Sequence, residues 1–187
     1  MTFAEMPTPG GYVCGEVASA FQKCIRRGLE EDALFWATEL DLAGFGEYVW
    51  KRLRIIVSED IGLAEPGLAA DLRALYDNWL DQRKKKDERH GPERLFLVHA
   101  VIRCARAQKS RMVDHALIVM YEGRRDQRPI PDFALDRHTS RGRRRHRGWK
   151  HFWEDGAHLG NPAQIEDLFG AQAREIRQDS QGELPFQ

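Results

Sequence analysis

The sequence predicts an all-α fold, a multi-helix bundle, from three observations. Apolar residues recur at three- and four-residue steps in several separate stretches, which is the period of one face of an α-helix. No stretch alternates apolar and polar residues with the clustered β-branched types that strands prefer. The chain has 187 residues, 42% of them hydrophobic and 31% charged, which suits one globular domain with its own core.

The predicted organisation begins with a flexible lead over residues 1–15, where two prolines and a glycine pair interrupt regular structure. A single helical domain is predicted to follow over residues 16–178. Its clearest helix lies within EYVWKRLRIIVSEDIG and ends at Gly62, with Pro66 close behind. The apolar stripe of this helix consists of Val49, Leu53, Ile56 and Val57.

Three further apolar stripes predict three more helices. The charged run DQRKKKDERHGP separates the first two of them, and we expect it to be solvated. The stripes are Leu68, Leu72, Leu75 and Leu80, then Leu95, Val98, Ile102 and Ala105, then Met112, Ala116, Val119 and Met120.

The last predicted helix begins near Asn161, after a loop-like region over residues 127–150. Asn161, Pro162 and Gln164 are typical of an N-cap, a first-turn proline and a capping partner. The apolar residues of this helix would be Ile165, Leu168, Phe169 and Ile176.

Charge and cysteine content limit the class of protein. Lysine plus arginine equals aspartate plus glutamate at 29 each, so the whole molecule is not expected to be drawn to nucleic acid or membrane. The N-terminal residues lack a secretory signal, and no apolar stretch approaches the ~18 residues of a spanning helix. We therefore expect a cytoplasmic protein with no membrane partner. Free buried thiols are predicted for Cys14, Cys24 and Cys104.

Positive charge is concentrated between residues 137 and 150, where no acidic residue occurs. Dense cations followed by Trp149, Phe152 and Trp153 could contact phosphates and stack on bases. The alternative is a structural or solvated charge run, in which arginines bind the protein's own carboxylates and carbonyls. The candidate nucleic-acid-binding residues are Arg141, Arg143, Arg144, Arg145, Arg147 and Lys150.

No catalytic constellation is evident, so a protein without enzymatic activity, metal or cofactor is predicted. Glu59 and Asp60 are adjacent, and on a helix their side chains would point ~100° apart, which suits polar contacts better than paired acid and base. The histidines between residues 138 and 158 are loosely spaced amid arginines, unlike zinc ligands. The alternative is a small nucleic-acid-processing enzyme that uses His138, His151 and the arginines.

Several segments resemble a known family. SAFQKCIRRG, DALFWATEL and RLRIIVSEDIGLAEP are similar to the C-terminal helical region of the bacterial replication-associated recombination ATPases, the RarA or MgsA family, which is related to clamp-loader subunits. The segment HTSRGRRRHRGWKHFWEDGAHLGN resembles short stand-alone relatives of that region. The similarity covers about 17–161 in pieces, and SEDIGLAEP is its most specific part. The resemblance implies a collar-like module of a replication-fork protein that forms homo-oligomers.

The family ATPases carry an AAA+ nucleotide-binding module ahead of this region, whereas here only a short lead precedes it. We therefore expect no ATPase activity. A further alternative is a regulatory subunit that inserts into a full-length family ATPase. That ATPase and a single-stranded DNA-binding protein are candidate partners, beside DNA itself.

Residues 179–187 form a predicted C-terminal tail. Its QGELPF resembles the short motif by which bacterial polymerases and repair proteins dock on the sliding clamp of DNA polymerase III. Gln181 would supply a hydrogen-bonding amide, Leu184 and Phe186 two apolar plugs, and Pro185 a stiff turn between them. The alternative is a tail that folds back onto its own domain. The resemblances together predict a DNA replication or repair accessory protein recruited by the sliding clamp.

Overall fold

The structure is a computed structural model that describes residues 2–84, 91–123 and 126–179. It confirms the all-α class, because the regular elements of these residues are helical apart from one antiparallel bridge between Pro7 and Val13. The chain divides into two compact units, Met1–Arg125 (unit 1) and Asp126–Gln187 (unit 2), where the sequence predicted a single domain over 16–178. None of the described helices is long and apolar enough to cross a membrane.

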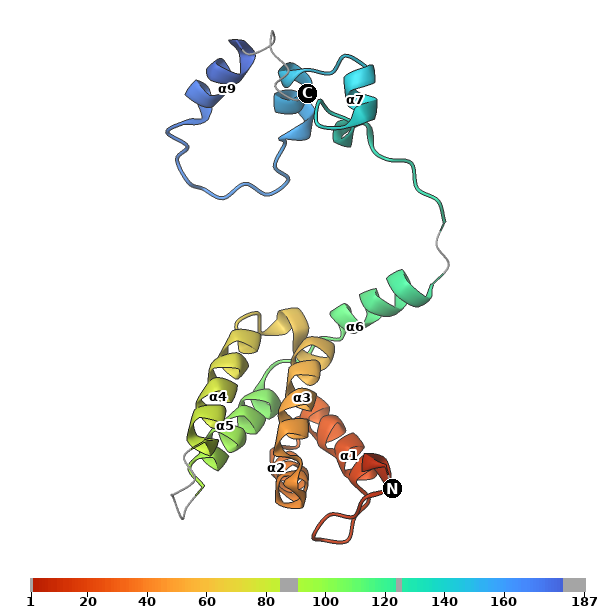
Figure 1. The fold of residues 1–187 in the computed structure, drawn as a ribbon, viewed down its shortest axis with the longest axis vertical. Helices are drawn as coiled ribbons and strands as arrows, with labels where there is room; N and C mark the ends of the chain where they lie inside the picture. Colours follow the sequence, from red (N-terminus) through yellow and green to blue (C-terminus); the bar gives the residue numbers. More distant parts are fainter. Residues whose placement is uncertain (1, 85–90, 124–125, 180–187) are drawn as a thin grey trace. The chain divides into compact units, whose positions relative to one another are not determined.

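Unit 1 contains the helices that pack side by side in Figure 1, namely α1 (Cys14–Arg27), α2 (Glu30–Leu40), α3 (Gly46–Ile56), α4 (Leu68–Arg83) and α5 (Glu93–Arg106). α1 packs against α2, and α4 packs against α5. α5 also contacts α1, α2 and α3, so it lies at the centre of the bundle. The apolar faces of the helices therefore meet in one core.

The core of unit 1 is built around large side chains that are fully buried, among them Phe21, Trp50 and Trp79. The ring centroids of Trp50 and Trp79 lie 6.0 Å apart, within the range of favourable aromatic pairs. The predicted stripe of α3 and the element that follows it is confirmed, since its four members are buried: Val49, Leu53, Ile56 and Val57.

The predicted stripe of α5 is partly wrong in its face, since of its four members only Ala105 is buried and Ile102 is half-buried. Leu95 is 70% exposed and Val98 is also exposed. Apolar residues surround this helix on more than one side, so their period alone does not identify the side that other helices cover. The small residues of the true face allow neighbouring helices to approach closely, and that face consists of Leu97, Ala100, Val101, Cys104 and Ala105.

The three cysteines are free thiols, and two of them are buried. Cys14 and Cys104 are buried and Cys24 is half-buried, all three as free thiols. Burial raises the pKa of the Cys104 thiol to about 12, so this group stays protonated near neutral pH.

A buried carboxylate joins α1 to the segment that follows α3, the π-helical η3 (Val57–Ile61). The Asp60 side chain is fully buried and accepts hydrogen bonds from Arg26 Nε at 2.5 Å and from Gln22 Nε2 at 3.0 Å. Its backbone carbonyl accepts from the Ser110 amide at 2.9 Å. These bonds fulfil the expectation of polar contacts at this helix end, because they satisfy a charge that burial alone would penalise.

The chain turns sharply after η3 at Gly62, as the sequence predicted. Gly62 has φ of 51°, a conformation that a side chain would strain, and Val113 Cγ2 lies 3.2 Å from the position of a Cβ there. The turn leads into the short helix η4 (Gly62–Ala64) and then to α4.

The predicted flexible lead makes specific contacts with unit 1. Phe3, in η1 (Phe3–Glu5), packs its ring 4.9 Å from that of Phe45 and 4.2 Å from that of Tyr48. Thr8 Oγ1 donates to Glu39 Oε2 at 2.6 Å. These contacts attach the lead to the body of unit 1.

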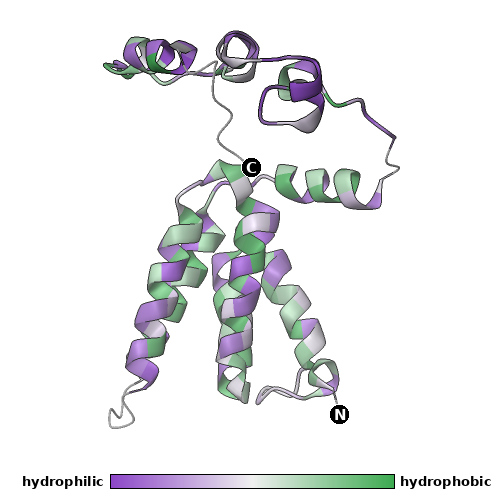
Figure 2. Cartoon of the chain, turned by 45° about the horizontal axis from the view of Figure 1, so that its top comes forward, coloured by the Kyte–Doolittle hydropathy of each residue, from purple (hydrophilic) through white to green (hydrophobic). Residues whose placement is uncertain are grey.

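The helix predicted from the stripe of Met112, Ala116, Val119 and Met120 forms as α6 (Met112–Leu117), which continues in η5 (Ile118–Glu122). α6 contacts η3 and η4, but the apolar side chains of α6 and η5 stay largely exposed. Figure 2 shows the hydrophobic colour of many residues of this helix. Val119, for example, is 63% exposed. The predicted stripe is therefore helical without being part of the unit 1 core.

Unit 2 has shorter elements: η6 (Asp132–Ala134), α7 (Ser140–Arg144), α8 (Trp149–His151), η7 (Phe152–Gly156) and α9 (Gly170–Asp179). The arginine run, predicted as a loop, is partly helical in α7. The helix start predicted at Asn161 is wrong, since α9 begins at Gly170 and Ile165, Leu168 and Phe169 are exposed. Capping residues alone do not stabilise a helix whose apolar side chains find nothing to pack on.

Candidate nucleic-acid interface

The arginine-rich segment starts from a well-defined N-cap. Thr139 Oγ1 accepts a hydrogen bond from the Gly142 amide and donates one to the Asp136 carbonyl, both at 3.0 Å. A Cβ at Gly142 would lie 1.7 Å from the Asp136 carbonyl oxygen, so only glycine fits there. The cap and this close approach fix α7 against the residues that precede it.

A carboxylate and a histidine extend this frame. The Asp136 carboxylate accepts from the His138 amide at 2.9 Å and lies 2.8 Å from His138 Nδ1. Burial alone would raise the pKa of the Asp136 carboxyl, but the hydrogen bonds from His138 outweigh it and the pKa lies below its ordinary value. The His138 ring packs edge-on against the rings of Trp149 and Phe152, at 5.8 and 5.3 Å between centroids.

Two of the candidate arginines are paired with a carboxylate of the protein itself. Arg147 Nη1 donates to the carbonyls of Asp132 at 2.7 Å and of Leu135 at 3.0 Å, and Nη2 binds the Asp132 carboxylate. Arg145 Nη1 donates to the same carboxylate at 2.9 Å. The hydrogen bond from Arg147 is the main reason why the pKa of Asp132 is lowered. The structural alternative therefore describes Arg145 and Arg147 well, and their contact with nucleic acid stays a prediction.

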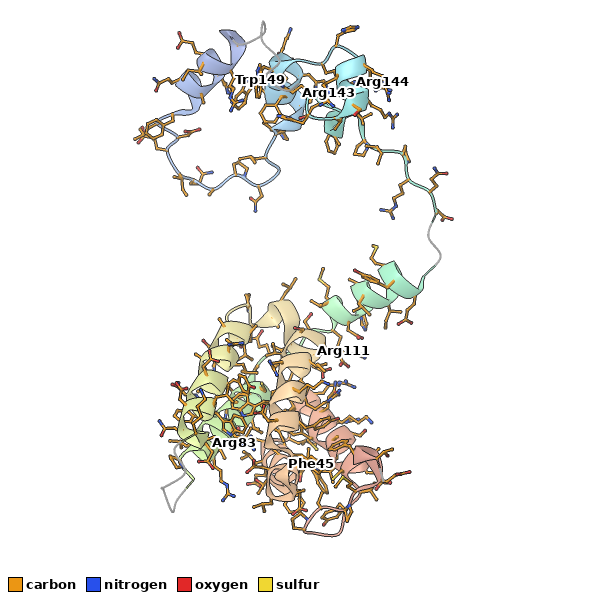
Figure 3. The ribbon with its side chains drawn as sticks, in the orientation of Figure 1. Phe45, Arg83, Arg111, Arg143, Arg144 and Trp149 are labelled. Carbon is orange, nitrogen blue, oxygen red and sulfur yellow. The ribbon has the colours of Figure 1, made fainter. Side chains whose placement is uncertain are left out.

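The other candidate cations are exposed. The side chains of Arg141, Arg144 and Lys150 have no hydrogen-bond or ion-pair partner within the described part of the chain, and Figure 3 shows Arg143 and Arg144 on α7. Arg143 is also exposed but is partly bound by the protein: it donates to the His138 carbonyl at 3.2 Å and to Ser140 Oγ at 3.4 Å, and to no described carboxylate. The structure thus separates the predicted set into anchored and available cations.

Trp149 is not available for base stacking. It is 5% exposed, with Arg137 Cζ 3.8 Å and Arg177 Cζ 4.5 Å from its ring centroid. Phe152 and Trp153 are half-buried against it, at 5.5 and 6.3 Å between centroids. The aromatic cluster is therefore first of all the small core of unit 2.

Histidines are the remaining chemical groups of the segment. His151 is largely buried, and neither ring nitrogen has a hydrogen-bond partner; its Nε2 lies 3.7 Å from the Asp155 carboxylate. Within residues 2–84, 91–123 and 126–179, no three His, Cys, Asp or Glu side chains are grouped as metal ligands would be.

Sequence reasoning missed the two carboxylates that organise the segment, Asp132 and Asp136. Both lie just before the arginine run, and an acidic residue close to dense cations is the signal that would have identified them. The tail residues Gln181, Leu184, Pro185 and Phe186 lie outside the described residues.

Comparison with protein-family models and with curated proteins found no match to this chain. The resemblance to the RarA family therefore remains an interpretation of the quoted segments.

Proposed function

We propose that this chain is a non-enzymatic accessory protein of DNA replication or repair whose unit 2 binds DNA phosphates. One observation carries the proposal: Arg141, Arg144 and Lys150 are exposed and unpaired among the described residues, on a segment that internal bonds already hold in place. A fixed backbone lowers the entropic cost of binding, because less of the segment must become ordered when it meets DNA. Each cation would release counterions from the DNA backbone.

The experiment compares two variants with equal loss of charge. Arg141→Gln/Arg144→Gln/Lys150→Gln removes the available cations of unit 2, whereas Lys51→Gln/Arg54→Gln/Arg73→Gln removes three exposed cations from unit 1. Fluorescence anisotropy with labelled duplex and single-stranded DNA should show about 100-fold weaker binding for the first variant at 0.1 M salt, since three phosphate contacts are lost. Equal affinity of the two variants would rule out unit 2 as the interface.

Recruitment is the second part of the proposal. We propose that Gln181, Leu184 and Phe186 dock on the sliding clamp, on the strength of the QGELPF sequence alone. Leu184→Ala/Phe186→Ala should abolish binding of the purified clamp in a titration, because each plug contributes about 1.5–3 kcal/mol when buried. Ile165→Ala/Leu168→Ala, which removes two exposed apolar side chains of unit 2, is the control and should bind normally.

Self-association is the third part, and the exposed apolar side chains of α6 and η5 support it. Contiguous exposed apolar surface on a globular protein often marks an interaction site. Leu117 and Val119 are both exposed there. Leu117→Asp/Val119→Asp should convert an oligomer into a monomer in light scattering, and an unchanged mass would place the interface elsewhere.

The Asp136–His138 pair favours a second candidate function, hydrolysis of nucleic acid. A carboxylate at Nδ1 orients an imidazole as it does in general-base pairs. Incubation with labelled single-stranded and duplex DNA, beside His138→Gln as the control, distinguishes this function from binding alone.

A further inference from the structure

A polar pocket of about 350 Å³ lies in unit 1, between α1 and α3. α1 contributes Ser19, Lys23 and Arg26 to its wall, at the three- and four-residue steps of one helix face. Arg52 of α3 and Glu59 of η3 complete the charged lining. Three cations thus face one carboxylate in the wall of this pocket.

The acidic groups at this site are already paired with arginines. Arg26 Nη2 lies 3.0 Å from Glu59 Oε1, and Arg26 Nε lies 2.5 Å from Asp60 Oδ1, behind the pocket. Arg111, which Figure 3 shows near the start of α6, lies 3.8 Å from the Glu59 carboxylate and 3.7 Å from that of Asp60. Asp114 is in turn paired with Arg111. Each of these three carboxylates therefore has an arginine within 4 Å, and Arg26 and Arg111 together carry one positive charge fewer than the three carboxylates.

Two further cations, Lys23 and Arg52, give this cluster one positive charge more than its three carboxylates. Lys23 Nζ donates to the Ser19 hydroxyl at 2.5 Å, and Arg52 Nη2 donates to the amide oxygen of Gln22. Neither has a carboxylate partner among the residues that the structure describes. Arg52 Nε is also buried with no acceptor. Arg52 Nη1 donates to no acceptor among the described residues, so an oxygen-rich anion in the pocket would provide one.

We propose that this pocket binds a phosphate group, carried either by a small solute such as a nucleotide or by a DNA strand. The guanidinium of Arg52 offers parallel donors that match two phosphate oxygens, and Lys23 adds a point charge. The volume is at the small end of ligand pockets, which suits one or two phosphate groups. The site belongs to unit 1 alone and does not depend on the cations of unit 2.

Calorimetric titration of the full chain with pyrophosphate, at ionic strength matched with chloride, tests the site. We expect saturable binding of one pyrophosphate per chain, weakened at least tenfold by Arg52→Gln and severalfold by Lys23→Gln. Lys51→Gln removes an equal charge from an exposed neighbouring position of α3 and should leave affinity within twofold of the wild type. Because Arg52 is half-buried, thermal unfolding without anion verifies that its variant folds, and exposed Lys23 provides an independent second variant.

Competition identifies the source of the phosphate. Displacement of pyrophosphate by ADP but not by a short duplex without terminal phosphates supports a nucleotide ligand, and displacement by the duplex supports the DNA backbone. Absence of saturable pyrophosphate binding would overturn the proposal. Equal weakening by Lys51→Gln and Arg52→Gln would also overturn it, since that result indicates attraction to general surface charge.

Discussion

The two units hold their structures by different means. Unit 1 buries large apolar side chains such as Phe21, Trp50 and Trp79 in one continuous core. Unit 2 buries few apolar side chains among its described residues, Leu135 and Trp149, and relies on the Thr139 cap and on the carboxylates of Asp132 and Asp136. Burial stabilises the first unit, whereas hydrogen bonds and ion pairs position the arginines of the second. Substitutions and pH should therefore affect the two units differently.

Truncation of the unit 1 core should have the largest effect. Trp50 is fully buried, so Trp50→Ala should lower the free energy of unfolding of unit 1 by about 3–5 kcal/mol. Denaturant unfolding followed by far-UV circular dichroism measures this cost. A loss below about 1 kcal/mol would show that the residue is not part of a closely packed core.

Removal of the buried carboxylate should cost somewhat less. Asp60→Ala removes the acceptor of Arg26 Nε and of Gln22 Nε2. Because Arg26 Nη2 keeps its bond to Glu59 and the Arg26 side chain is 29% exposed, we expect a loss of about 2–4 kcal/mol. Asp77→Ala breaks the exposed pair of Arg73 and Asp77 and should cost less than about 1 kcal/mol. Similar costs for both substitutions would indicate that the Asp60 site is solvated.

In unit 2 the close backbone approach at Gly142 should determine the stability of α7. Gly142→Ala places a methyl group against the Asp136 carbonyl and should destabilise α7 by about 1–3 kcal/mol. Gly160→Ala meets no atom within 4 Å and serves as the matched control. Hydrogen exchange of the α7 amides measures both, and equal protection in the two variants would contradict the close approach.

Acid should weaken unit 2 through Asp132. Its pKa is lowered in the folded protein, mainly by the hydrogen bond from Arg147, so the stabilisation is complete above the ordinary value of 3.8 and is lost as the pH falls through the folded value. Thermal unfolding of unit 2 between about pH 5 and pH 2 should show this decrease, and Asp132→Asn should flatten it. A pH dependence that is identical in wild type and Asp132→Asn would contradict the role of this carboxylate.

The same contrast explains what the sequence could predict. The stripe of α3 was correct because its apolar residues occupy one face and that face meets the core. The face of α5 was partly wrong, because the buried side of this helix depends on which helices surround it. The start of α9 was wrong, because a helix there would need a packing partner that capping residues cannot supply. The sequence analysis left open whether the arginine run is functional or structural. Only the structure shows that Arg147 binds the Asp132 carboxylate whereas the Arg144 side chain has no described partner.

The salt dependence of DNA binding tests the central proposal most directly, because its slope counts phosphate contacts. If Arg141, Arg144 and Lys150 each contact a duplex phosphate, their joint replacement by glutamine should reduce the slope of log K against log salt by about 2.7. The matched triple variant of unit 1 should retain the wild-type slope. An unchanged slope in the unit 2 variant would contradict the proposal that its available cations form the nucleic-acid interface.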